Sequence, residues 1–114
     1  MPPSVIVVIQ EDPQKTHRSV EALRIALGLS TGENSLSVVL LGQAPLLISE
    51  APEDIVDGEI LEKYLPSFKH LKIPFVVPVG TGTRFNFDPE FEVEEQSEEA
   101  VRAAIASSDR ILVF

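Results

Sequence analysis

The sequence contains no cysteine, and this absence restricts its chemistry more than any other feature of the 114 residues. Without a thiol, the chain can form neither a disulfide nor a thiolate metal site. It also cannot carry a persulfide or a thioester on a cysteine of its own.

Basic residues are scarce as well. Nine Lys and Arg stand against eighteen Asp and Glu, which gives a formal net charge of −9. Binding along a nucleic-acid backbone depends on clustered basic side chains that release counterions from the phosphates. The charge balance therefore argues against a DNA or RNA partner.

Long apolar runs are absent too, since no segment approaches the roughly 18 to 20 consecutive apolar residues that a membrane span needs. The apolar start, Val5 to Ile9, follows Pro2-Pro3-Ser4 without a basic residue, and it is too short for a signal peptide. We expect a cytoplasmic protein that does not enter a membrane.

What the sequence does contain is a hydrophobic fraction of 44%, enough for one globular domain over residues 1–114. Its apolar residues gather in runs that are continuous rather than alternating, which is typical of strands covered on both faces. The predicted strands are residues 4–10, 35–41, 75–79 and 110–114.

Helical patterns separate these strands. Asp12 as a cap and Pro13 as the first helical residue predict a helix from about Gln14 to Leu29. A second helix is predicted over about 58–71, where Pro66 should kink it or split it in two.

A third helix is expected after Ser97, which is a good N-cap residue. Strands that alternate with helices in this way predict an α/β three-layer sandwich of the flavodoxin-like kind. Its sheet should be mostly parallel and contain four to five strands.

Several local phrases resemble the DsrE/DsrF-like family of small α/β sulfur-relay proteins, which includes the Tus subunits. The phrases are Glu21-Ala-Leu-Arg-Ile-Ala-Leu-Gly-Leu29, Val38-Val-Leu-Leu-Gly42 and Ser108-Asp-Arg-Ile-Leu-Val-Phe114. The resemblance covers most of the chain. It implies a DsrE-like three-layer sandwich that assembles as a homo-oligomer: a dimer, a trimer or a hexamer.

The resemblance also implies where chemistry would occur. Active sulfur carriers of this family hold a persulfide on a cysteine near the end of the third strand. The corresponding region here is about Val77 to Gly82, where no residue can form a persulfide. Other family members lack the cysteine and contribute interfaces, and the resemblance implies that this chain is one of those.

The loop that follows the third predicted strand is the main candidate binding site. Ligands in α/β folds bind beyond the carboxyl ends of the strands, where Asp12 and Gln43 should also lie. The backbone N–H groups, two hydroxyls and a guanidinium of the loop could bind phosphate or sulfate. An ordinary turn is the alternative, because the loop matches no phosphate-binding motif. Its residues are Gly80, Thr81, Gly82, Thr83 and Arg84.

Residues 85–93 alternate between apolar and polar side chains, which predicts a short exposed strand or an extended flap. Phe85, Phe87 and Phe91 lie on its apolar edge. These phenylalanines either fold back onto the core or pack into another subunit.

No catalytic constellation is recognisable. His17 and His70 have no ligand-spaced companion, so we expect neither a metal nor a cofactor. The main hypothesis is a non-catalytic oligomeric binding or scaffolding subunit. The alternatives are an enzyme that binds a small anion or nucleotide at residues 80–84, and a sulfur-relay component whose protein partner supplies the cysteine.

Overall fold

A computed structural model describes residues 3–32, 35–50, 52 and 54–114. In this part of the chain, five strands form one parallel sheet in the order β4-β3-β2-β1-β5. The predicted α/β sheet of four to five strands is confirmed. The strands are β1 Ser4–Ile9, β2 Ser35–Leu40, β3 Phe75–Pro78, β4 Val93–Gln96 and β5 Arg110–Val113.

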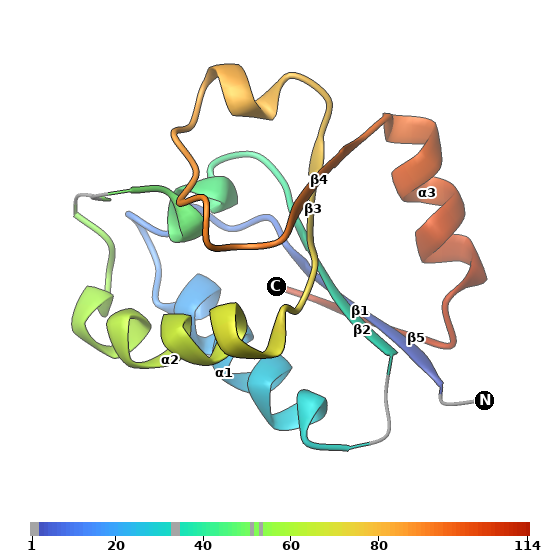
Figure 1. Cartoon of the computed structure of the whole chain (residues 1–114), viewed down its shortest axis with the longest axis horizontal. Coiled ribbons are helices and arrows are strands. Elements are labelled where there is room, and N and C mark those ends of the chain that lie inside the picture. Colours follow the sequence, from blue (N-terminus) through green and yellow to red (C-terminus); the bar gives the residue numbers. More distant parts are fainter. Residues whose placement is uncertain (1–2, 33–34, 51, 53) are drawn as a thin grey trace.

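Helices cover both faces of the sheet, as a three-layer sandwich requires. Figure 1 shows α1 and α2 on one side and α3 on the other. None of the helices in the described residues is long and apolar enough to cross a membrane. The helices are α1 Arg18–Ser30, α2 Gly58–Leu71 and α3 Glu98–Ser107, and two short 3₁₀ helices are η1 Ala44–Ile48 and η2 Thr81–Thr83.

The core has two parts, one on each side of the sheet. Val7 and Ile9 of β1 belong to the larger part, which lies against α1 and α2, whereas Ile6 and Val8 belong to the smaller part with Val101 of α3. Successive side chains of a strand point to opposite faces, so a strand buried on both faces must be apolar throughout. This is the reason for the continuous apolar run of β1.

The first helix begins later than the sequence predicts. The Asp12 carboxylate accepts a hydrogen bond from the backbone N–H of Gln14 at 2.9 Å, and its carbonyl oxygen accepts from Lys15 at 3.0 Å. These contacts form a separate turn, and α1 starts only at Arg18. The prediction that Asp12 caps this helix is therefore wrong, because aspartate can satisfy a turn of its own equally well.

The second helix passes through Pro66 without interruption, so of the two predicted outcomes, a kink or a split, the split does not occur. Leu61 and Phe68 are buried on its core side, while Ile60 and Leu71 are 40% and 52% exposed. Burial of the first two side chains offsets the hydrogen bond that the proline cannot donate.

The segment before β4 differs from the predicted exposed strand or flap. Phe87 forms an isolated antiparallel bridge with Ser49, and the N–H of Asp88 donates to the carbonyl oxygen of Ile48 at 3.0 Å. Of the predicted flap, only Val93 enters a named strand, β4, which pairs with β3. The rest of β4 is polar because it lies at the sheet edge, where charged side chains remain in water.

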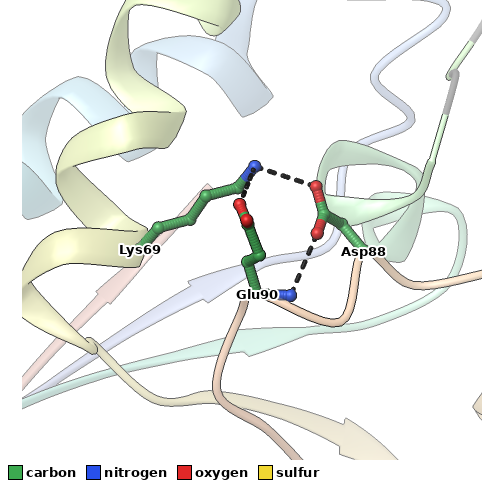
Figure 2. Close-up of polar contacts among 3 residues, drawn as sticks. All are labelled: Lys69, Asp88 and Glu90. Carbon is green, nitrogen blue, oxygen red and sulfur yellow. Dashed lines mark hydrogen bonds and ion pairs between the residues drawn. The ribbon is translucent and has the colours of Figure 1, made fainter.

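A lysine on α2 contacts the segment before β4, at residues 88–91 (Figure 2). Lys69 Nζ lies 2.8 Å from Asp88 Oδ2 and 3.1 Å from Glu90 Oε2. The ammonium group also lies 5.0 Å from the centre of the Phe91 ring, which packs edge-on against Phe75. The hydrogen bond from Lys69 lowers the pKa of Asp88, and the same bond raises the pKa of Lys69.

We predict that Lys69→Met lowers the free energy of unfolding at neutral pH by about 1 kcal/mol, from the lost ion pair and ring contact. Urea unfolding measures the difference. Lys63→Met is the matched control, because Lys63 lies exposed on the same helix and forms no ion pair among the described residues.

The effect of Lys69→Met should depend on pH. A carboxylate whose pKa is lowered by folding stabilises the folded state above its unfolded pKa of about 3.9, and this contribution disappears as the pH falls through the folded value. The difference between wild type and Lys69→Met should therefore shrink in acid. If the difference in stability stays constant while the pH falls well below the pKa of a free aspartate, the ion pair with Asp88 is not the cause of that difference.

Candidate functional site

The predicted site residues lie at one edge of the sheet, but they do not form one constellation. Asp12 follows β1, Gln43 follows β2 and the loop of residues 80–84 follows β3, and all three strands are parallel. Asp12 is engaged in its own turn, and the Gln43 carbonyl oxygen accepts from Leu46. Within the described residues, neither side chain forms a hydrogen bond or ion pair with the loop.

The central feature of the loop is an internal carboxylate. Glu95 Oε1 accepts hydrogen bonds from the backbone N–H of Gly80 at 3.1 Å and of Gly82 at 3.0 Å. These two N–H groups are the donors that the sequence offers to a phosphate or sulfate. The chain's own anion therefore occupies the position that an external anion would take.

The two hydroxyls of the loop are also engaged. The Thr81 hydroxyl donates to the carbonyl oxygen of Pro78 at 2.5 Å, and the Thr83 hydroxyl donates to that of Gly80 at 2.7 Å. The Arg84 guanidinium lies 5.3 Å from the centre of the Phe85 ring. Because hydroxyls that donate to carbonyl oxygens are not activated by a base, neither threonine is arranged as a nucleophile.

Glycine is required at one position of the loop by backbone conformation. Gly80 has a φ of 91°, which residues with a side chain rarely adopt. At Gly82, by contrast, an added Cβ would lie 3.5 Å from Glu95 Oε1, an ordinary contact distance. The conformation of Gly80 brings the N–H groups of residues 80 and 82 onto one carboxylate oxygen.

Glu95 is a residue of this candidate site that sequence reasoning missed. In the sequence it belongs to an acidic run that suggests a solvated face. Its role depends on parallel pairing of β4 with β3, in which Glu95 lies opposite Val77, just before the loop. No periodicity within residues 80–95 predicts that pairing.

A shallow hollow of about 340 Å³ lies near the same edge, on the α3 side of the sheet. Arg102 is the cationic group of its lining, and its guanidinium pairs with the Glu98 carboxylate at 2.6 Å. The local charge is thereby balanced, and the wall is mainly apolar. The lining residues are Leu41, Pro78, Glu98, Val101, Arg102 and Ile105.

The three phenylalanines predicted to mediate an interface have different environments. Phe91 is 7% exposed and belongs to the core, and Phe87 packs against that core. Phe85 is half-buried and stacks on Phe87 with 6.5 Å between ring centres. Of the two alternatives, folding back onto the core describes Phe91 and Phe87, and Phe85 contacts the domain through Phe87.

The titratable residues give no sign of a metal centre. In the described ranges, no group of three or more His, Asp or Glu side chains is arranged to hold a metal ion. His17 and His70 are both exposed and lie near the ends of different helices.

Comparison by sequence gives no relative, because no family model and no curated protein matches this chain. Comparison by structure does. Seven chains of solved structures match, among them the crystal structure of the YchN protein from E. coli, with a TM-score of 0.78 over 100% of both chains. The chain shares the DsrE-like fold of YchN. The two sequences are 18% identical, so the likeness to YchN concerns the fold alone.

We predict that Glu95→Ala opens the loop to anions. Wild-type protein should show no change in melting temperature with millimolar phosphate or sulfate, whereas the variant should be stabilised by either. Without ligand, the variant should lose about 1 kcal/mol of stability, because two N–H groups lose a charged acceptor. Thermal unfolding measures both effects.

Glu94→Ala is the control for this experiment. It removes the same charge from the same strand, and Glu94 accepts a hydrogen bond from Gln96 rather than from the loop. Equal phosphate binding by wild type and Glu95→Ala, seen as shifts of the Gly80 and Gly82 amide resonances, would contradict the blocked-loop interpretation.

Alanine at two glycines should have opposite effects. Gly80→Ala should destabilise the fold by about 1 kcal/mol or more, because alanine is strained at that φ. Gly28→Ala should stabilise it by up to about 1 kcal/mol, because Gly28 lies in α1 with nothing within 4 Å of an added Cβ. Denaturant unfolding measures both, and a stable Gly80→Ala variant would show that the loop relaxes.

Proposed function

We propose that this chain is a non-catalytic subunit of the DsrE/DsrF-like kind. It assembles with copies of itself in the cytoplasm and acts as a binding or scaffolding component, in the context of sulfur metabolism. The observation that carries the proposal is the closed, thiol-free end of β3. At this position, the family resemblance implies a persulfide-carrying cysteine in active members.

The residues at this strand end offer no replacement for the missing thiol. Val77 is fully buried and Val79 is 69% exposed, and both are chemically inert. Thr81 is buried and its hydroxyl is bound to a carbonyl oxygen, so it is neither accessible nor activated. Glu95 occupies the neighbouring N–H groups. A covalent carrier needs an exposed nucleophile, which this strand end lacks.

The blocked loop also weighs against the small-anion enzyme. An incoming phosphate would have to displace Glu95 and overcome its negative charge, on a chain with a formal net charge of −9. The relay alternative, in which a partner supplies the cysteine, needs only a surface for that partner. It is therefore compatible with a binding role.

Assembly is supported by the apolar surface that the single chain leaves in water. Large apolar side chains on β5, at the β3 end and on α2 are between 36% and 69% exposed. These exposed side chains are Ile60, Leu71, Val79, Ile111, Leu112 and Val113. Only Ile111, Leu112 and Val113 follow one another in a single strand, and adjacent exposed apolar side chains on a small domain usually mark a contact surface, whereas single ones such as Val79 do not.

We predict a homo-oligomer at tens of micromolar chain. Native mass spectrometry and sedimentation velocity should both give a multiple of the 12.5 kDa chain mass. Purification at high salt keeps charge-driven aggregation out of the measurement. A strictly monomeric protein under these conditions would remove the scaffolding proposal.

A further inference from the structure

One edge of the sheet is apolar and open. β5 pairs with β1 on one side, and no other strand of the described residues lies on its other side. Its side chains Ile111, Leu112 and Val113 are 41%, 36% and 54% exposed. An edge strand with a row of exposed apolar residues readily pairs with another strand.

The opposite edge of the sheet, β4, carries charged side chains that discourage pairing with a strand of another molecule. β4 has the sequence Val-Glu-Glu-Gln, and its glutamates, Glu94 and Glu95, are exposed. Charged side chains on an edge strand discourage pairing between molecules. The chain therefore protects the middle of β4 with two carboxylates, whereas β5 carries a charge only at its first residue, Arg110.

The backbone of β5 has groups available for pairing. The N–H of Phe114 donates to Val8 and its carbonyl oxygen accepts from Gln10, both at 2.8 Å, so both groups of Phe114 point toward β1. Along an edge strand, the backbone N–H and C=O groups of successive residues point alternately toward the neighbouring strand and away from it. Leu112 therefore also bonds inward, and Ile111 and Val113 direct their N–H and C=O groups outward.

We propose that the free edge of β5 pairs in antiparallel fashion with β5 of a second copy, about a twofold axis at Leu112. This inference rests on the proposed self-assembly and names its surface. In this register Ile111 lies opposite the partner's Val113, and Val113 lies opposite the partner's Ile111. The outward groups then meet as hydrogen-bonded pairs, while Leu112 faces the partner's Leu112 in a non-hydrogen-bonded pair.

Both faces of β5 suit this arrangement. Ile111 and Val113 are paired with Ile6 and Val8, so their side chains lie on the α3 face of the sheet. Leu112 is paired with Val7 and lies on the other face. Twofold pairing therefore extends both core layers across the boundary, in a continuous sheet of two sets of five strands.

Charge favours a second copy as the occupant. The N–H of Glu11 lies 3.4 Å from the Phe114 carbonyl oxygen, so Glu11 is next to the end of β5. In the proposed register Arg110 lies opposite the partner's Phe114 and close to the partner's Glu11. Neither side chain forms an ion pair within the described part of one chain. The twofold axis would create two such pairs, which offset the repulsion between two acidic molecules.

The edge is thus complementary to itself. It presents a symmetric apolar centre, with a cation at one end and an anion at the other. A surface of this kind closes into a dimer, because the same patch is used on both copies. Pairing of β5 with the acidic β4 of another copy would instead repeat without closing.

The test compares the same substitution at two exposed valines. Val113→Lys places a charge in the proposed contact and should weaken self-association by about tenfold or more. Val79→Lys makes the same change beyond β3, at a side chain that is 69% exposed, and should leave association unchanged. Sedimentation velocity measures both, and circular dichroism and melting temperature show that both variants fold.

Exchanging the charges of Arg110 and Glu11 tests the proposed register of the two β5 strands. This test does not require that the strand tolerate a lysine. Arg110→Glu should weaken association because two carboxylates then face each other. The double variant Arg110→Glu with Glu11→Arg should restore it. Failure of the double variant to recover, with both proteins folded, would overturn the twofold register.

The outcomes separate this inference from the proposed function. Monomeric wild-type protein removes both. Oligomeric wild type whose association is unaffected by Val113→Lys overturns the β5 contact and leaves the scaffolding proposal in place. A trimer as the largest species also overturns it, since a twofold contact cannot build one. A dimer that dissociates, or a hexamer that falls to trimers, only in Val113→Lys supports it.

Discussion

The parallel pairing of β1 with β2 and β5 is the constraint on which the rest of this structure depends. Parallel neighbours cannot be joined by a hairpin, so each connection must cross a face of the sheet, and helices come to cover both faces. This explains why β1 is apolar from Val5 to Ile9. It also places the carboxyl ends of all strands at one edge, where a binding site of this fold is expected.

At that edge, the position of β4 decides the character of the loop. Because β4 adds in parallel beside β3, Glu95 comes within hydrogen-bond distance of Gly80 and Gly82. A loop that looks like an anion site is thereby closed by an anion of the chain itself. This strand end therefore has no thiol, and two of its backbone N–H groups are bound by the carboxylate.

The two edges of the sheet differ in chemical character, which the overall composition does not suggest. Acidic residues cover β4, while β5 exposes Ile111, Leu112 and Val113. The net charge of −9 keeps copies of the chain apart in general, so any association must use a local surface with both apolar side chains and opposite charges. In the proposed dimer, fold and assembly use the same strand: one side of β5 pairs with β1, and the other side pairs with the second copy.

The sequence by itself determined the parts of this protein that depend on local pattern: four apolar strands, the cap at Ser97, the α/β class and the lack of a thiol. An α/β sandwich follows from these, and the DsrE-like form that the family resemblance implies agrees with the fold shared with YchN. The start of α1, the passage of α2 through Pro66, the strand at Val93–Gln96 and the bond from Glu95 to the loop were decided only by the tertiary structure. The physical reason is that an edge strand and a capping carboxylate are defined by their neighbours in the sheet. The order of strands in a sheet depends on contacts between residues far apart in the sequence, whereas periodicity can be read from adjacent residues.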